Sequence, residues 1–292
     1  MPAVSLKFAR TQLPAVITSF GTALRSMTPL TRARALAPST PAIDCRFAAP
    51  AADLVDAYAR WSGAPPERYS QHLPAHFCSH WAFALLARLA AQAPYNLSRV
   101  LNQGLQLEIH TTIPRQVDLQ LRGQLINVSE DAQRVRLHMH VTAGFDAIAN
   151  AISLHSYAAV PKPGARKIPR SARDEPAFET VGSWSVNEGE GLDFALLTGD
   201  FNPIHTLPLV GKRTRFKGCI LHGFGIVART WEVLANAGFD IRSIDLRFIK
   251  PVPLPSHNLQ VQVSDAQADG RRAFRLQNPD GAVHIAGRFG QA

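Results

Sequence analysis

The sequence predicts an α+β protein made of two consecutive units, each with one long helix and several antiparallel strands. Segments that alternate apolar and polar residues, as half-buried strands do, fall into two groups, and each group is accompanied by one apolar stretch with helical spacing. A basic, proline-rich segment at 161–176 separates the groups. With 292 residues, the chain is long enough for two modest domains.

The elements of each unit follow from these patterns in chain order. In the first unit we expect a helix over 80–92, then strands at 106–109, 117–126, 135–141 and 149–160. In the second unit we expect a strand at 178–186, a helix over 223–237, then strands at 243–249, 258–263, 271–276 and 282–289.

The two units also share a short stretch of sequence. Residues 107–119, which run from Leu107-Glu108-Ile109 through Pro114, resemble residues 246–260, which run from Leu246-Arg247-Phe248 through Pro253. A repeat of this kind indicates that one structural unit occurs twice.

Composition and cysteine usage describe a globular chain in a reducing compartment. Hydrophobic residues make up 46% and charged residues 18%, and no apolar run reaches the roughly 18 residues that cross a bilayer. The three cysteines, Cys45, Cys78 and Cys219, have no C-x-x-C spacing, which argues against disulfides and structural zinc. We therefore expect a soluble, cytoplasmic protein, in which Cys219 is a small buried residue rather than a nucleophile.

The first 43 residues are basic and contain no acidic side chain before Asp44. We expect an N-terminal arm that packs on the body, with a transit peptide as the alternative. The predicted organisation is then an arm over 1–43, a first unit over 44–160, a basic linker over 161–176 and a second unit over 177–292.

The motif that indicates chemistry begins at Gly199-Asp200-Phe201-Asn202-Pro203-Ile204-His205 and continues at Leu221-His222-Gly223. Pro203 fixes a turn that lets Asp200 and His205 converge on one small molecule, a geometry suited to acid-base catalysis on a water. Gly223 opens an apolar helix, where a ligand oxygen can approach backbone N–H groups and the positive end of the dipole. Together these features indicate enolate or acyl chemistry.

These residues resemble the signature of the MaoC-like dehydratases, the (R)-specific enoyl-CoA hydratases, which reads roughly G-D-x-N-P-[LI]-H-x-D-P, then a phenylalanine, then H-G. The matching positions are Gly199, Asp200, Asn202, Pro203, Ile204, His205, Pro208, Phe216, Ile220, His222 and Gly223. The segment Arg247-Phe248-Ile249-Lys250-Pro251-Val252 also looks like the family's strand after the central helix.

The resemblance implies a double hot-dog fold, in which each unit wraps an antiparallel sheet around a central helix. It implies hydration of trans-2-enoyl thioesters to (R)-3-hydroxyacyl thioesters, or the reverse, in fatty-acid metabolism, with no cofactor and no metal. Asp200 and His205 would hold the water, and the Gly223 amide would bind the thioester oxygen. Asn202 would shape the turn, His222 would support the site, and Phe216 would line or brace the pocket.

Two positions depart from the family pattern. Leu207 stands where the family usually has a second aspartate, and Trp231 stands near the place of a polar helix residue, with Thr230 as a possible substitute. If that polar residue normally supports the catalytic aspartate, its absence bears on turnover rate or substrate choice.

The first unit lacks the Asp-x-Asn-Pro-x-x-His block before its helix, so we interpret it as a degenerate copy widened to admit an acyl chain. His72, His76 and His80 are spaced four apart, but Pro74 interrupts any helix that would align them on a metal. We expect solvent-exposed or capping roles for these three, and surface positions for His138 and His140.

Basic residues concentrate on the loop between the two motif blocks, at Lys212, Arg213, Arg215 and Lys217, in a chain of net charge +9. Beside an active site they could bind the phosphates of coenzyme A or of phosphopantetheine, or the acidic surface of an acyl carrier protein. A solvated basic loop is the alternative. No recognition-helix, zinc or aromatic-basic pattern indicates a nucleic-acid partner.

Other functions stay open at this point. The run Gly223-Phe224-Gly225-Ile226-Val227-Ala228, with Asp245 further on, approximates a dinucleotide-binding motif, but no alternating helix and strand series surrounds it. A thioesterase or a non-catalytic acyl-thioester binder would keep the fold and change the role. Both a monomer and a homodimer are compatible with two units in one chain.

Overall fold

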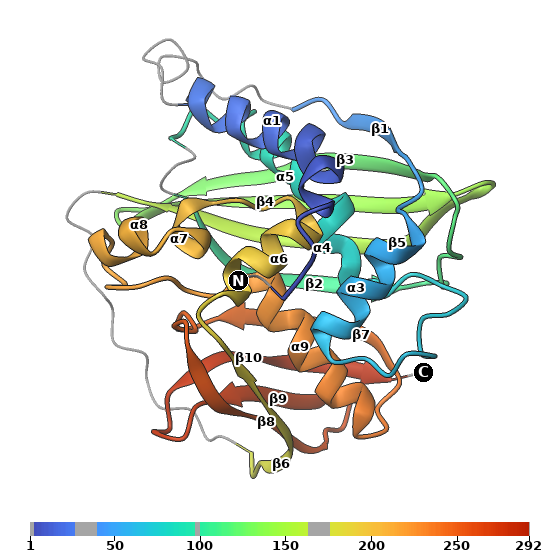
Figure 1. Ribbon diagram of the computed structural model, residues 1–292, viewed down its shortest axis with the longest axis vertical. Coiled ribbons are helices and arrows are strands. Elements are labelled where there is room, and N and C mark those ends of the chain that lie inside the picture. Colours follow the sequence, from blue (N-terminus) through green and yellow to red (C-terminus); the bar gives the residue numbers. More distant parts are fainter. Residues whose placement is uncertain (1–2, 27–39, 97–99, 163–175, 292) are drawn as a thin grey trace.

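The computed structural model describes residues 3–26, 40–96, 100–162 and 176–291. Most of the predicted linker, 163–175, lies outside these residues. Within them, ten antiparallel strands form one sheet in the order β1-β3-β4-β5-β2-β7-β10-β9-β8-β6 (Figure 1). The strands are β1 (Ile43–Phe47), β2 (Leu101–Ile109), β3 (Leu119–Glu130), β4 (Arg134–Phe145), β5 (Ile148–Pro161), β6 (Glu179–Val186), β7 (Ile241–Phe248), β8 (Ser256–Ala266), β9 (Arg272–Gln277) and β10 (Val283–Gln291).

The sheet consists of two equivalent halves that meet at β2 and β7. Five strands come from each predicted unit, and their order reverses across the junction, so that β2 corresponds to β7 and β1 to β6. The junction pairs Leu105 with Leu246 and Leu107 with Ile244, which places the repeated sequence of both units at its centre. The two sheets that we expected are therefore joined edge to edge into one.

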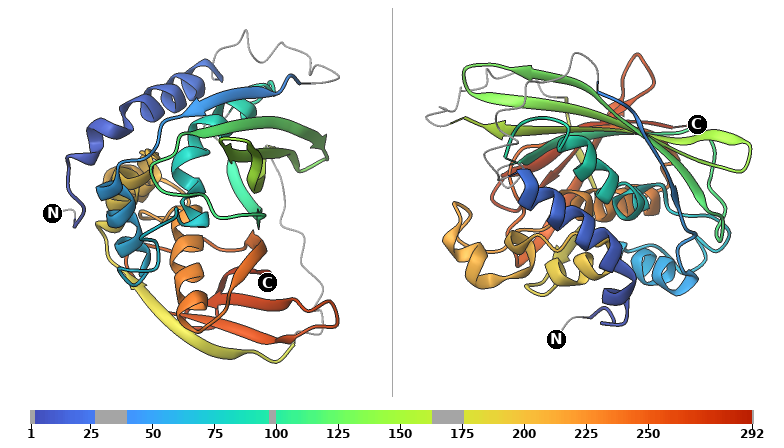
Figure 2. Two further views of the ribbon diagram at one scale, coloured as in Figure 1. Left: turned by 90° about the vertical axis from the view of Figure 1, so that its right-hand side faces the viewer. Right: turned by 90° about the horizontal axis from the view of Figure 1, so that it is seen from above.

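Helices cover the inner face of the sheet. Their bounds are α1 (Phe8–Ser26), α3 (Ala52–Ser62), η1 (Ala75–Phe77), α4 (Cys78–Trp81), α5 (Phe83–Ala90), α6 (Glu190–Thr198), α7 (Pro203–Thr206), α8 (Pro208–Arg213) and α9 (Gly223–Asn236). The long helix α9 lies in the second half, and α4 with α5 takes its place in the first (Figure 2). Their apolar faces and the inward side chains of the strands form one large core, so that burial of this shared surface holds the halves together.

The expected strands and the helix at 223–237 are all present, with shifts of a few residues at their ends. The helix expected over 80–92 is divided at Ala82 into α4 and α5. Three elements were not predicted from the sequence: β1 and α3, which precede the first predicted helix, and α6, which precedes the motif. In α6 the periodic signal is weak, since this helix is buried on nearly every side. The helix α3 does carry an apolar face that the sequence could have revealed.

The basic N-terminal segment contains α1, which packs across both halves on the side of the helical layer away from the sheet (Figure 2). Phe8 is buried in the core, and the backbone N–H of Val4 donates to Asp193 Oδ1 at 3.0 Å. Gln12 is also buried, beside Gly199 at the start of the motif. The arm is thus part of the folded body next to the candidate site.

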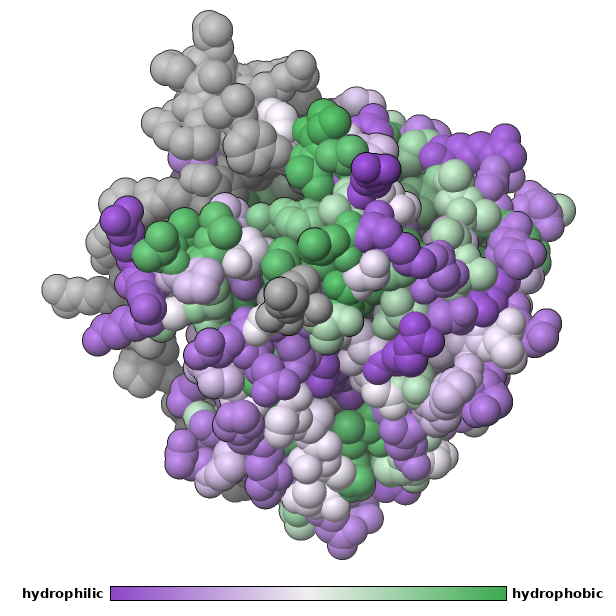
Figure 3. Space-filling view, viewed as in Figure 1, coloured by the Kyte–Doolittle hydropathy of each residue, from purple (hydrophilic) through white to green (hydrophobic). Residues whose placement is uncertain are grey.

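Exposed aliphatic side chains concentrate on α1 and on the α7–α8 segment. Among the described large hydrophobic residues that are more than a third exposed, five belong to these segments and Leu6 lies just before α1: Leu6, Leu13, Ile17, Leu207, Leu209 and Val210. Figure 3 shows apolar surface over both segments, with hydrophilic residues around it. None of the described helices has the length and apolarity needed to span a membrane.

Candidate active site

The motif loop begins where α6 ends. Gly199 closes α6 in the left-handed region, with φ of 86°, which favours glycine and turns the chain sharply toward α7. Asn202 then caps α7, since its side-chain oxygen accepts the backbone N–H of Ile204 at 3.3 Å. The turn places Asp200 before α7 and His205 on it.

Asp200, His205 and His222 lie together at the start of α9. One carboxylate oxygen and one ring nitrogen from each histidine all lie within 4.8 Å of one another. The His205 and His222 rings have centroids 3.9 Å apart and planes inclined by 31°. The structure therefore brings together the predicted acid, the predicted base and the histidine that precedes Gly223.

Backbone carbonyls fix the tautomers of both histidines, because a carbonyl oxygen only accepts hydrogen bonds. His205 donates from Nδ1 to the carbonyl of Ile220 at 2.7 Å, which leaves Nε2 of the neutral ring with a free lone pair. His222 donates from Nε2 to the backbone carbonyl of Asp200 at 2.8 Å and so braces the loop that carries the carboxylate. His205 is thus prepared to act as a base, and His222 to position Asp200.

Burial keeps these groups close to their neutral forms. Burial raises the pKa of the Asp200 carboxyl, although His205 and the Asn202 backbone N–H oppose this shift. Burial lowers the pKa of His205, partly offset by Asp200, and lowers the pKa of His222 well below its ordinary value. Charged forms are disfavoured in such surroundings, which brings the proton affinities of Asp200 and His205 closer together.

Gly223 is the first residue of α9, where the leading N–H groups have no partner within the helix. A Cβ at this position would lie 2.9 Å from Cζ of Phe248, so glycine is required for the packing of that ring against the helix start. The leading N–H groups of α9, rather than the space beside the Gly223 Cα, are what a ligand oxygen could use. Donors at a helix start beside an acid-base pair can stabilise a developing oxyanion.

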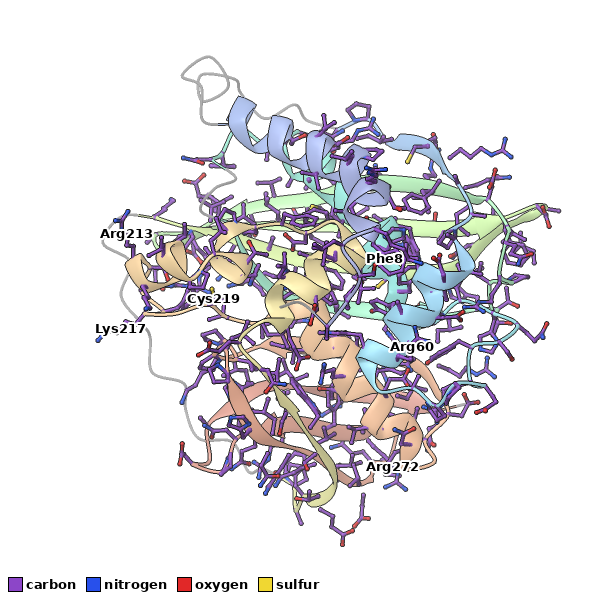
Figure 4. The ribbon with its side chains drawn as sticks, in the orientation of Figure 1. Phe8, Arg60, Arg213, Lys217, Cys219 and Arg272 are labelled. Atoms are coloured by element: carbon purple, nitrogen blue, oxygen red, sulfur yellow. The ribbon has the colours of Figure 1, made fainter. Side chains whose placement is uncertain are left out.

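The other predicted site residues are less tightly gathered. Phe216 is half-buried and stacks under the guanidinium of Arg215 at 4.8 Å. The four basic side chains of the loop, Lys212, Arg213, Arg215 and Lys217, are all exposed. Figure 4 shows Arg213 and Lys217 extending away from the body of the molecule.

A metal ion fits the site poorly, although its donor set of one carboxylate and two imidazoles is one that metals accept. One nitrogen of each ring is already hydrogen-bonded to a backbone carbonyl, and the two rings lie against each other at 3.9 Å rather than being spread around a common point. The arrangement is better suited to proton transfer between Asp200, His205 and a bound water.

The histidines of the first half belong to the core and do not form the metal site that their spacing could suggest. His76 is buried and binds Tyr58 through Nδ1 at 3.1 Å and Glu232 through Nε2 at 2.7 Å. His80 is buried and stacks on Phe77 at 4.7 Å. The expectation of solvent-exposed or capping roles is wrong for His76 and His80, because the helix that follows Pro74 turns both rings inward. Among the described residues, only the Asp200 cluster brings three potential metal ligands together.

His138 and His140 are half-buried on β4 rather than fully exposed. Nε2 of His138 lies 3.0 Å from Nδ1 of His155, and Nε2 of His140 lies 2.7 Å from the Ser153 hydroxyl. Both contacts belong to the sheet, away from the helix start at Gly223.

Sequence reasoning missed a buried ionic network centred on Glu232. Its carboxylate accepts hydrogen bonds from Arg68 and Tyr69, both at 2.6 Å, and contacts His76. Glu232 follows Trp231, which packs near the His76 ring, and Thr230, whose buried hydroxyl has no partner among the described residues. A glutamate within the apolar run of the predicted helix was the available signal, since unpaired carboxylates are rarely buried.

Comparison with known proteins gives one family match. The model of the MaoC like domain matches residues 171–278. Residues 171–278 carry a MaoC-like domain. It contains the whole motif from Gly199 to Gly223, and a search of the curated proteins found no match for the chain.

Solved structures similar to this chain extend the likeness beyond the MaoC-like domain to the first half. HtdX of Mycobacterium tuberculosis is 20% identical with a TM-score of 0.69, over 86% of this chain and 100% of that one. A MaoC-like dehydratase from Phytophthora capsici is 16% identical with a TM-score of 0.68, over 88% and 96%. A conserved hypothetical protein from M. tuberculosis, described as having a double hotdog fold, is 12% identical with a TM-score of 0.53, over 88% and 97%. The predicted double hot-dog fold is confirmed.

Proposed function

We propose that the protein catalyses the reversible hydration of a trans-2-enoyl thioester to the (R)-3-hydroxyacyl thioester. The observation that carries this proposal is the free Nε2 lone pair of His205 beside Asp200, at the start of α9. The match of residues 171–278 to the MaoC like domain supports a dehydratase or hydratase over an oxidoreductase. A dinucleotide-binding motif at Gly223 would need a doubly wound parallel sheet, whereas the sheet here is antiparallel.

Each step follows from the positions of these groups. Asp200 and His205 hold a water, and the pair accepts one of its protons as the water oxygen attacks C3 of the enoyl group. Negative charge moves to the thioester oxygen, where the N–H groups at Gly223 stabilise it. The pair then returns a proton to C2. Water adds across the double bond without a change in redox state, so the reaction balances with no co-substrate.

The test is loss of the enoyl thioester absorbance when the protein meets crotonyl-CoA and a medium-chain trans-2-enoyl-CoA, followed by chiral analysis of the product. We expect the (R)-3-hydroxyacyl thioester, with little activity from Asp200→Asn or His205→Ala. Release of free thiol would indicate a thioesterase, and acyl-CoA binding without either reaction would indicate a binding protein. Either result would overturn the proposal.

A further inference from the structure

A cavity of about 580 Å³ lies where the two halves of the sheet separate. The pairing between β2 and β7 ends at Gly104 and Arg247, and beyond Gly104 strand β2 pairs with β5 alone. A bulge in β2 places Gln103 at this point. The cavity therefore opens at the end of the junction between the two halves.

The lining of the cavity combines cationic, polar and apolar side chains. Arg134, Arg136 and Arg247 supply guanidinium groups, with further polar groups from Gln103, Asn127, Ser129, His138 and Tyr157. Leu137, Ala158 and Phe248 supply the apolar part. A ligand that fits this lining has an anionic end and a less polar arm.

The arginines differ in how far they are already neutralised. Arg136 pairs with Asp131 at 2.7 Å and Arg247 pairs with Asp245 at 2.8 Å, and the Arg247 guanidinium also lies 4.5 Å above the Tyr157 ring. The Arg134 guanidinium makes no ion pair or hydrogen bond with any of the described residues. A planar guanidinium of this kind is suited to bidentate binding of a phosphate.

Phe248 borders both this cavity and the candidate active site. Its ring contributes to the cavity lining and also covers the start of α9, where a Cβ on Gly223 would lie 2.9 Å from it. A thioester held at Gly223 could thus extend its arm past Phe248 into the cavity and carry phosphate groups to the arginines.

We propose that this cavity binds the phosphate end of the thiol carrier, with Arg134 as its principal anchor. This inference rests on the proposed function, because it assumes a thioester at Gly223. It replaces the basic loop at Lys212, Arg213, Arg215 and Lys217 as the phosphate site, since Arg213 and Lys217 of that loop extend away from the body (Figure 4). Coenzyme A and phosphopantetheine share the phosphorylated pantetheine that this lining would recognise.

The kinetic test compares trans-2-enoyl thioesters of coenzyme A, phosphopantetheine and N-acetylcysteamine, the last of which has no phosphate. We expect Arg134→Gln, alone and combined with Arg136→Gln, to raise KM for the coenzyme A substrate by about tenfold or more and to leave kcat unchanged. The N-acetylcysteamine substrate should not respond. A phosphopantetheine substrate that responds equally would place the decisive phosphate on the pantetheine arm, and a weaker response would place it on the nucleotide.

Matched variants complete the design. Arg242→Gln with Arg288→Gln removes the same charge from exposed strand arginines that also have aspartate neighbours, and should leave KM unchanged. A rise in KM from Lys212→Gln with Arg213→Gln, without any rise from the cavity variants, would overturn the assignment to the cavity.

Calorimetric titration with free coenzyme A separates this inference from the proposed reaction. Binding that weakens about tenfold in Arg134→Gln supports the cavity even if the protein shows no hydration. Absence of binding, or equal binding by the variant, would overturn the inference whatever the turnover.

Discussion

The two halves of the molecule reach their central helices by similar routes. In each half a helix follows the edge strand and ends at a glycine in the left-handed region, Gly63 in the first half and Gly199 in the second. The segment after this glycine is then joined by an isolated β-bridge to the loop that follows β2 or β7. The bridge pairs His72 with Pro114 in the first half and Ile220 with Pro253 in the second. Pro74 lies two residues after His72, and His222 lies two residues after Ile220. Both have nearly the same backbone dihedral angles, and each immediately precedes the next helix.

What differs is the length and content of the connection between these matching points. The first half takes eleven positions from Gly63 to Pro74, whereas the second takes twenty-three from Gly199 to His222. The additional residues form α7 and α8 and bring His205 beside Asp200. One fold thus holds a candidate site in one half and none at the equivalent place in the other.

Histidines occur in both halves, and their partners decide what each can do. Both ring nitrogens of His76 contact Tyr58 or Glu232 inside the core, so this ring serves the fold. His205 uses one nitrogen to hold a carbonyl and keeps the other free. Histidine content alone therefore does not indicate chemistry, whereas a free lone pair beside a carboxylate does.

The largest expected effect comes from removing the acid or the base of the second half. His205→Ala and Asp200→Asn should each lower the hydration rate about 10³-fold, within the range for positioned acid-base groups, with the thermal midpoint nearly unchanged. His72→Ala removes a half-buried histidine of the first half and should keep full activity. Equal losses from all three variants would remove the contrast between the halves.

Breaking the buried network between the halves should lower stability instead of catalysis. Glu232→Gln leaves Arg68 and His76 without their carboxylate and should lower the free energy of unfolding by about 3–5 kcal/mol. Urea denaturation measures this change, and the exposed Glu188→Gln is the control. A change below about 1 kcal/mol, the usual value of a surface pair, would show that the network adds little.

Acid should destabilise the first half through His80. Burial lowers the pKa of His80 from 6.5 to about 4, so the unfolded state takes up a proton first as pH falls. Stability from this residue is therefore complete above pH 6.5 and declines toward pH 4, by about 3 kcal/mol at 1.36 kcal/mol per pH unit. In His80→Phe, unfolding free energies measured from pH 7 to pH 4 should fall less steeply than in the wild type. Parallel curves would contradict this role.

A smaller effect on stability is expected from adding a methyl group at the start of α9 or removing one at the start of η1. Gly223→Ala places Cβ against Phe248 and should cost about 1–3 kcal/mol of stability, with a clear loss of activity. The equivalent residue of the first half is Ala75, which already carries a methyl group. Ala75→Gly should therefore leave the hydration rate unchanged. Full activity in Gly223→Ala would show that close approach to this backbone is not needed.

Much of this contrast could be predicted from the sequence because local patterns encode it. Alternation located the strands, and the spacing from Asp200 to Gly223 located the candidate site. The joining of the two sheets through β2 and β7 was not predictable, since any two edge strands can pair and no local pattern selects the partner. Glu232 and Arg68 are 164 residues apart in the chain, and they come into contact only because the two halves pack together.

The decisive experiment is hydration of a trans-2-enoyl-CoA in water enriched in ¹⁸O, followed by mass spectrometry. We expect one ¹⁸O atom in an intact (R)-3-hydroxyacyl thioester with the wild-type protein and with His72→Ala, and labelling about 10³-fold slower with Asp200→Asn. Label in a free carboxylic acid, or in the hydroxyacyl thioester formed by Asp200→Asn at the wild-type rate, would contradict the proposed reaction.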